Sequence, residues 1–230
     1  MAETLNISTP DFARALAYCL AYDHVGDSPD ADLLQRLLSG RPIASDEERL
    51  ANIVLLAQYA LTDLPEDESG RERLQWIAER SRDLGNPRVA LIMGGATKIK
   101  QYVFESARLP EIRGASSLLD RLNLIGVPAL FSTTNGEDRE WADEIRERFR
   151  ARHGRAPIDC RDCMIYANGG EFLAFSPTIL ASMIADEVEF LYTSETGAAD
   201  SVAVWQAFEL PELAGGIDAL SFRITNQSLV

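Results

Sequence analysis

The fold is decided by two apolar segments that each end in a glycine pair, Val89-Ala90-Leu91-Ile92-Met93-Gly94-Gly95 and Met164-Ile165-Tyr166-Ala167-Asn168-Gly169-Gly170. The second pair is followed at once by another apolar run, Glu171-Phe172-Leu173-Ala174-Phe175. Two apolar runs joined by Gly-Gly are typical of a tight β-hairpin, because primed turns need positive φ and glycine supplies it without a clash at Cβ. The sequence therefore predicts a hairpin with Gly169-Gly170 at its turn.

Strands and helices alternate after Gly85-Asn86-Pro87. The apolar periodicity predicts strands at 88–93, 127–132, 163–168, 171–176 and 201–208, and helices at 97–106, 115–125, 137–152 and 177–192. When the segment 127–152 is set aside, the order becomes strand, two helices, hairpin, helix, strand. That order predicts an α+β fold of the ferredoxin-like, split βαβ type.

Residues 1–86 have a different pattern, with amphipathic helical segments separated by short loops. We therefore expect two units: a small all-helical N-terminal unit at 1–86 and a ferredoxin-like domain at 87–230.

Composition limits the function classes. The net charge is −14, with 36 acidic against 22 basic residues, which argues against a broad nucleic-acid surface. No apolar run approaches the roughly 18 residues that span a bilayer. The first residues, Met1-Ala2-Glu3-Thr4, lack the charged start and apolar core of a signal peptide. We expect a cytoplasmic protein with no membrane partner.

Two motifs resemble a known family. Gly94-Gly95-Ala96-Thr97-Lys98-Ile99-Lys100-Gln101-Tyr102-Val103-Phe104, followed by Leu109-Pro110-Glu111-Ile112-Arg113-Gly114-Ala115-Ser116-Ser117-Leu118-Leu119, resembles the first Palm domain of the large subunit of type III CRISPR effector complexes (Cmr/Csm type). The hairpin is similar to the Gly-Gly-x-Phe hairpin of the same Palm. The resemblance covers about residues 88–215.

The resemblance implies a Palm domain related to GGDEF and nucleotide-cyclase domains, working in antiviral defence. Complete members carry two Palms that face each other and bind ATP with Mg²⁺ between them. The second Palm carries Gly-Gly-Asp-Asp, whose carboxylates hold the metal ions, and the product is cyclic oligoadenylate, made when target RNA is bound. The implied partners are a second Palm polypeptide or domain and other type III CRISPR subunits with guide RNA.

This chain departs from the family pattern in four respects. It contains no Gly-Gly-Asp-Asp, and it has Gly94-Gly95 where active relatives place an aspartate at the end of the first strand. His24 is followed by Val25, so the HD nuclease motif of some members is absent. Val230 falls about where the linker to the second Palm would begin.

These departures bear on catalysis. Two-metal nucleotidyl transfer needs carboxylates from two neighbouring strands, and Glu171 is the single acid at the hairpin. We therefore expect no catalytic residue and no nucleotidyl transfer by the chain alone. Glu171 is either a metal ligand completed by a partner or a hairpin residue that faces solvent or a partner.

Candidate nucleotide-binding residues lie at the motifs. Gly94 and Gly95 precede a predicted helix, whose first N–H groups favour phosphate, although such a pair is also common in tight turns. Gly169 and Gly170 would let a nucleotide approach the backbone, or serve as turn residues alone.

Polar and charged side chains beside the glycines add further candidates. Ser116 could bond a ribose or base, or cap its helix. Arg113 could pair with phosphate or form a surface ion pair. Lys98 could reach a triphosphate or remain solvated.

Cys160-x-x-Cys163 has the spacing of half a zinc site, with His153 seven residues earlier. A closed structural site needs four ligands, so a pair of reduced cysteines is the alternative.

Three functions remain open. The first is the Palm half of a composite ATP site for cyclic oligoadenylate synthesis. The second is a non-catalytic scaffold whose acidic surface docks basic neighbours in a CRISPR ribonucleoprotein. The third is a homodimeric nucleotide cyclase, against which the missing aspartates argue.

Overall fold

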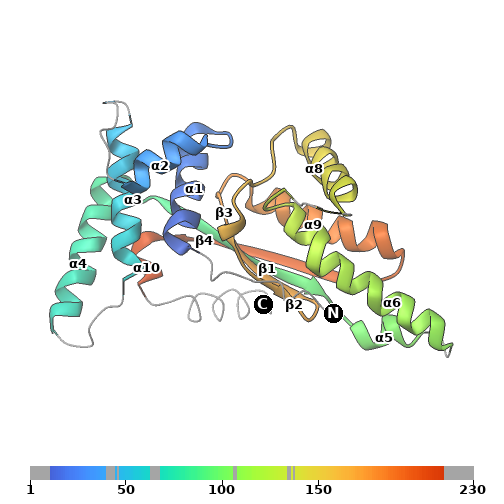
Figure 1. Cartoon of the computed structure of the whole chain (residues 1–230). Helices are drawn as coiled ribbons and strands as arrows, with labels where there is room; N and C mark the ends of the chain where they lie inside the picture. The colour runs from blue at the N-terminus through green and yellow to red at the C-terminus, as the bar shows by residue number, and fades with distance from the viewer. Residues whose placement is uncertain are drawn as a thin grey trace.

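The computed structural model describes residues 11–39, 45, 47–62, 68–105, 108–133, 136 and 138–214. Its described strands are β1 (Arg88–Ala96), β2 (Met164–Asn168), β3 (Glu171–Ser176) and β4 (Ser201–Glu209), and they form a four-stranded sheet in the order β2-β3-β1-β4 (Figure 1). Each neighbouring pair is antiparallel. With helices after β1 and β3, this order is the ferredoxin-like arrangement, which confirms the predicted fold class.

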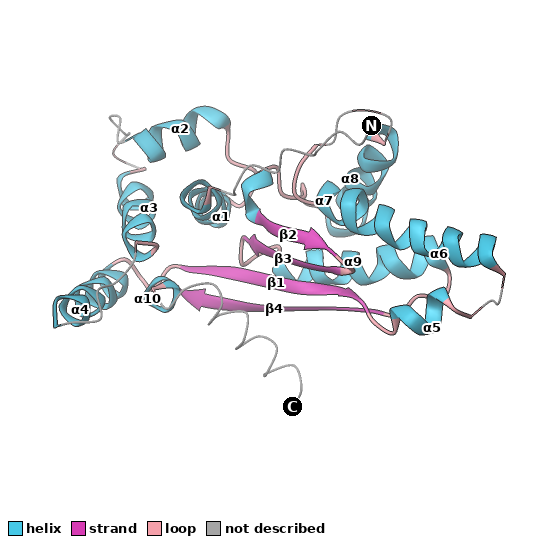
Figure 2. Cartoon of the chain, turned by 60° about the horizontal axis from the view of Figure 1, so that its bottom comes forward, coloured by secondary structure: helices cyan, strands magenta, loops and turns pink. Residues whose placement is uncertain are grey.

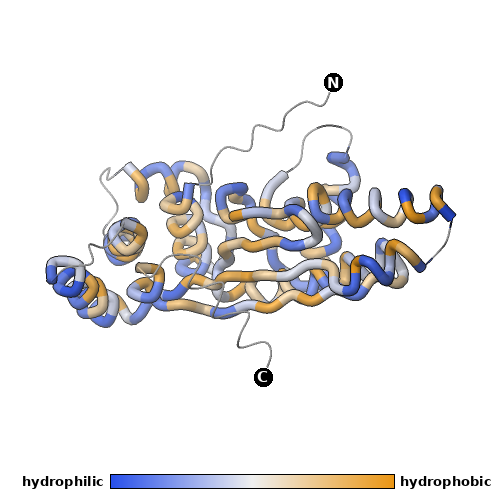
Figure 3. The backbone as a smooth tube through the Cα atoms, turned by 90° about the horizontal axis from the view of Figure 1, so that it is seen from below, coloured by the Kyte–Doolittle hydropathy of each residue, from blue (hydrophilic) through white to orange (hydrophobic). Residues whose placement is uncertain are grey.

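Helices connect the strands on one side of the sheet. The segment between β1 and β2 contains α5 (Ile99–Val103), α6 (Leu109–Arg121), the π-helical η1 (Leu122–Gly126), α7 (Val127–Ala129), α8 (Arg139–His153) and the 3₁₀ turn η2 (Arg161–Cys163). The connection from β3 to β4 is α9 (Ala181–Thr196), which lies behind the strands in Figure 2. Hydrophobic residues gather in the central strands, as Figure 3 shows from below.

The predicted N-terminal helices are present as α1 (Phe12–Val25), α2 (Ala31–Ser39), α3 (Glu48–Ala60) and α4 (Glu68–Asp83). They gather at one end of the molecule, where α10 (Leu210–Leu213) packs against α3 and α4 (Figure 1). No helix within the described ranges is both long and apolar enough to cross a membrane.

The predicted strand at 127–132 is wrong, because this segment is helical and then turns. Val127, Leu130 and Phe131 are fully buried, and a short buried apolar run does not by itself distinguish strand from helix. Pro128 stands in α7, directly after the π-helical turn η1. The predicted helix at 97–106 is shorter than expected, since β1 continues to Ala96 and α5 begins at Ile99.

Helix α1 packs directly on the sheet region. The Phe12 ring meets the Phe175 ring edge-on, with centroids 5.9 Å apart. The Tyr22 hydroxyl donates to Ala156 O at 2.8 Å, and the Tyr18 hydroxyl accepts from Asp159 N at 2.8 Å. The boundary at residue 86 stays a prediction, and α1 contacts residues on both sides of it.

Helix α8 is held against α9 by ion pairs with a buried carboxylate. Glu187 is fully buried, and its carboxylate accepts from Arg148 Nε at 2.9 Å and from Arg152 at 2.6 Å. Both guanidinium groups also lie over the Phe190 ring. These ion pairs fix the position of α8 on α9, because a buried carboxylate that lost its cationic partners would be left as an uncompensated buried charge.

Asp23 at the end of α1 binds the turn that leads into α9. Its carboxylate accepts from the backbone and hydroxyl of Thr178, both at 2.8 Å, and from Ile179 N at 3.1 Å. Burial raises the pKa of this carboxyl, and the bonds from Thr178 and Ile179 oppose that shift. Asp23 therefore fixes the position of α1 relative to the start of α9.

Replacing Asp23 by alanine should lower the free energy of unfolding by about 2 kcal/mol, because the half-buried donors of Thr178 and Ile179 lose their acceptor. Urea unfolding followed by circular dichroism measures this change. The control is Asp32→Ala, which removes an exposed ion pair with Arg36 and should change stability by less than about 0.5 kcal/mol. Equal effects of the two substitutions would contradict the assigned role of Asp23.

Candidate functional site

The predicted hairpin is confirmed. Asn168 pairs with Glu171 across the turn, and the two residues between them, Gly169 and Gly170, have φ of 59° and 92°. Positive φ at both central turn residues is the geometry that glycine adopts without strain. The second glycine pair therefore has a structural role in closing β2 on β3.

The end of β1 meets this turn. Ala96 N donates to Gly170 O at 2.9 Å, and Gly95 stands in register with Glu171 on β3 and with Val202 on β4. The two motifs that the sequence singled out thus form one corner of the sheet. We call it the glycine corner and define it by Gly94, Gly95, Gly169, Gly170 and Glu171.

Close chain approach explains the first glycine pair. A Cβ on Gly95 would lie 1.9 Å from Gly170 O, and a Cβ on Gly94 would lie 2.4 Å from Val202 O. No side chain fits at either distance. Both glycines lie inside β1. The sequence pattern predicts them directly before a helix, and that position is wrong because β1 continues through both residues. Their contact with a nucleotide phosphate stays a prediction.

Glu171 is exposed at the start of β3. Burial raises the pKa of the Tyr166 hydroxyl, and the negative charge of Glu171 adds to that shift. Within the described ranges no group of three or more His, Cys, Asp or Glu side chains is placed to hold a metal ion. Glu171 is therefore a lone carboxylate at the glycine corner, and its role as a metal ligand stays a prediction.

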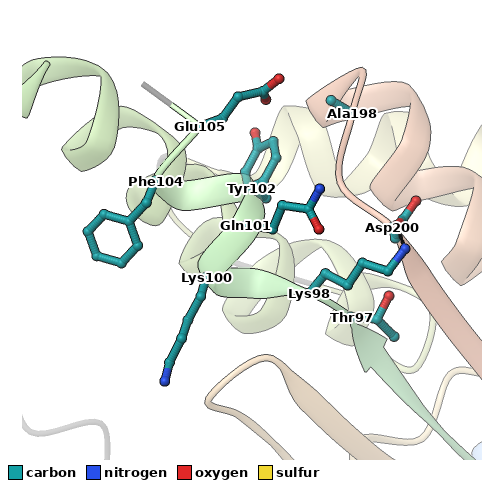
Figure 4. A pocket seen from close by; sticks show the side chains of 9 residues that line it. All are labelled: Thr97, Lys98, Lys100, Gln101, Tyr102, Phe104, Glu105, Ala198 and Asp200. Carbon is teal, nitrogen blue, oxygen red and sulfur yellow. Dashed lines mark hydrogen bonds and ion pairs between the residues drawn. The ribbon is translucent and has the colours of Figure 1, made fainter. Parts of the chain in front are cut away.

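A hollow of about 350 Å³ opens beside α5. Figure 4 shows the residues that line it: Thr97, Lys98, Lys100, Gln101, Tyr102, Phe104, Glu105, Ala198 and Asp200. The Lys98 amine lies 2.9 Å from the Asp200 carboxylate, whereas Lys100 points away from Asp200 (Figure 4). Two lysines and two carboxylates balance the charge of this hollow. Lys98 also has a φ of 51°, which is rare for a residue with a side chain.

Ser116 and Arg113 occupy a different position from the one predicted. Helix α6 begins at Leu109 with Arg108 as its N-cap, so both residues lie in its interior. Ser116 is therefore not a helix cap. Both side chains are exposed, and Arg113 forms none of the ion pairs found among the described residues. The start of α6 was misjudged because Arg-Gly-Ala-Ser has the composition of a turn, whereas Gly114 here is helical.

The cysteines form a buried thiol cluster. Cys19, Cys160 and Cys163 are free and buried, and the Cys19 and Cys163 sulfurs are 3.8 Å apart. Burial raises the pKa of both Cys19 and Cys163, which keeps these thiols protonated and unreactive. His153 lies instead beside Glu187, at 3.6 Å. The two alternatives for Cys160 and Cys163, half of a zinc site or a pair of reduced cysteines, stay predictions, and the approach of Cys19 has no sequence signal.

Comparison with known proteins gives limited matches. No family model and no curated protein matches the chain. Two solved structures are similar: a chain of the apo Csm1–Csm4 cassette, at 17% identity and a TM-score of 0.37, and Csm1 of T. onnurineus, at 15% and 0.33. The first match covers 80% of this chain and 23% of that chain, and the second covers 88% and 31%.

Both descriptions name Csm1. The present chain spans only about a quarter to a third of the length of these two chains. At such low TM-scores the fold class rests on the sheet order and not on the superposition.

Gly95→Ala should lower the free energy of unfolding by about 3 kcal/mol, because the new methyl group meets the Gly170 carbonyl and the turn must shift. Gly114→Ala is the matched control: a Cβ there meets no atom within 4 Å, and alanine in a helix interior should add up to about 1 kcal/mol. Chemical denaturation of both variants measures the difference. A Gly95→Ala variant as stable as the parent would refute the close approach.

The Lys98→Gly variant should be about 1 kcal/mol more stable to unfolding than the Lys98→Ala variant. Glycine adopts the left-handed backbone conformation of this position without strain, whereas alanine does not. Both variants lose the exposed pair with Asp200, so their difference isolates the backbone contribution. Thermal unfolding compares them. If the two variants melt together, Lys98 is not strained.

Proposed function

We propose that this chain supplies one Palm half of a composite ATP site in a type III CRISPR large-subunit assembly, with the Gly-Gly-Asp-Asp half on a second Palm. The paired site would make cyclic oligoadenylate in antiviral defence. The proposal is supported by the two sequence motifs and by the ferredoxin-like sheet order. The other type III subunits and the guide RNA would be the partners of that assembly.

The observation that carries the proposal is the glycine corner. Two motifs that are distant in the sequence are joined there by the hydrogen bond from Ala96 N to Gly170 O. Space beside Gly169 is open, since a Cβ there meets no atom within 4 Å. A ligand can therefore approach the backbone of Gly169 closely without meeting a side chain, whereas the Ile99 side chain covers Gly170.

The neighbouring side chains would position the nucleotide. Lys98 and Lys100 would offer positive charge to its phosphates from the adjoining hollow, once Lys98 leaves Asp200. Ser116 and Arg113 are exposed on α6 and are available to hydrogen-bond the ribose and a phosphate.

The residues here fit only part of a metal site. Glu171 alone offers a carboxylate at the glycine corner, because Asp200 is paired with Lys98. Two-metal transfer needs carboxylates on two neighbouring strands, so the second Palm would have to provide the others. When bound, ATP with Mg²⁺ would bring the triphosphate that reacts, and this chain's residues would orient it.

The test compares the purified chain with a mixture of the chain, a Gly-Gly-Asp-Asp Palm polypeptide, the other type III subunits, guide RNA and target RNA. Both samples receive ATP and Mg²⁺. We expect oligoadenylate from the mixture and none from the chain alone. Lys98→Ala should weaken ATP binding by the mixture about tenfold, the loss of one charge–phosphate contact. Arg139→Ala, which removes an exposed pair with Asp143 on α8, should leave ATP binding unchanged.

Two outcomes contradict the proposal. Oligoadenylate made by the chain alone would show a complete active site and favour the homodimeric cyclase. A mixture that assembles but binds no ATP would favour the scaffold, in agreement with the balanced charge of the hollow beside α5.

A further inference from the structure

Strand β4 forms one edge of the described sheet, on the opposite side from the β2–β3 hairpin. It is nine residues long and contains no proline and no charged residue before Glu209. Val202 and Trp205 on it are 46% and 45% exposed. Edge strands are usually protected by charge, proline or short length, because an open edge pairs with other chains. β4 has none of these protections along its middle.

The register fixes which backbone groups face outward. Thr97 N donates to Asp200 O, and hydrogen-bonded pairs alternate with non-bonded pairs along an antiparallel ladder. The residues that bond to β1 are therefore Val202, Val204, Gln206 and Phe208. Those whose N–H and C=O groups face away from β1 are Ala203, Trp205, Ala207 and Glu209.

Two of the outward N–H groups are already satisfied by side chains. Ala203 N donates to Glu189 Oε1 at 2.9 Å, and Glu209 N donates to Glu212 Oε2 at 2.8 Å. Between these carboxylates, the outward N–H groups of Trp205 and Ala207 find no partner among the described residues. We call residues 204–208 the edge window.

The ends of the edge window are acidic. Glu189 stands at one end. At the other end stand Glu212 and Glu209, of which Glu209 pairs with Arg88 at 3.0 Å, so this end keeps a net negative charge. The whole chain also carries a net charge of −14, which disfavours pairing with a second copy. A strand that fits must therefore be short, carry positive charge at its ends, and present apolar side chains to Trp205.

We propose that the edge window binds an extended segment of a partner protein, which adds a fifth strand to the sheet and places lysine or arginine residues at its ends. Main-chain hydrogen bonds to Trp205 and Ala207 give the affinity, and the flanking carboxylates select the charge. This docking site is separate from the glycine corner and needs no ATP. It goes beyond the proposed ATP site and is testable without it.

The probe is a synthetic peptide, Lys-Lys-Val-Thr-Val-Thr-Val-Lys-Lys, added to the isotope-labelled chain. In the free chain the Trp205 and Ala207 amides should exchange rapidly with solvent. Saturating peptide should slow both by about a hundredfold, as pairing protects them. The matched peptide with glutamate in place of lysine should bind at least about tenfold more weakly, because it meets Glu189 and Glu212.

Ala207→Pro tests the backbone contact, since proline removes an outward N–H and leaves the bonds to β1 in place. Peptide affinity should fall at least about tenfold. If that variant misfolds, Trp205→Lys serves instead, because a lysine in the edge window repels the basic peptide. Unchanged amide exchange with peptide, equal binding of the two peptides, or protection caused by dimerisation of the chain itself would each overturn the proposal.

Discussion

The close approach of Gly95 to the Gly170 carbonyl is the contact on which the rest of the sheet corner depends. It lets β1 run straight past the hairpin turn, so that Ala96 bonds to Gly170 and Thr97 bonds to Asp200. The chain then turns sharply through the left-handed Lys98 into α5. A side chain at Gly95 would push the hairpin away from β1. The packing of β1 against β3 and against the hairpin turn therefore depends on glycine at this position.

The sequence predicts what local chemistry determines. The hairpin, its Gly-Gly turn and the strands on either side follow from alternation and turn residues, and the order of elements gives the ferredoxin-like fold. The predicted strand at 127–132 is wrong because its apolar residues are fully buried. In a short buried run, apolar periodicity does not distinguish a strand from a helix. The predicted start of α6 is too late in the chain because Gly114 is typical of a turn, whereas here it lies within the helix.

The candidate site was predictable in its glycines and not in its side-chain partners. The pairing of Lys98 with Asp200 and the contact of Cys19 with Cys163 join residues far apart in the chain, and no local pattern reports such contacts. The positions of the charged side chains are likewise not predictable from the sequence. The composition gives the acidic excess, but only the fold reveals that Glu187 is buried with arginine partners and that other carboxylates lie at the ends of β4.

The docking of α1 has a consequence for biosynthesis. This helix is the first described element to leave the ribosome, yet its hydrogen bonds reach Ala156, Asp159 and Thr178. All of these acceptors and donors exist only once translation has passed the β3–α9 turn. The face of α1 that packs on the sheet region therefore stays exposed while most of the chain is made, whereas its contacts with α2 and α3 can form early. Contacts of such high sequence separation slow folding, since loop closure must precede them. The nascent chain is therefore most exposed to aggregation and chaperone capture in the interval before the β3–α9 turn emerges.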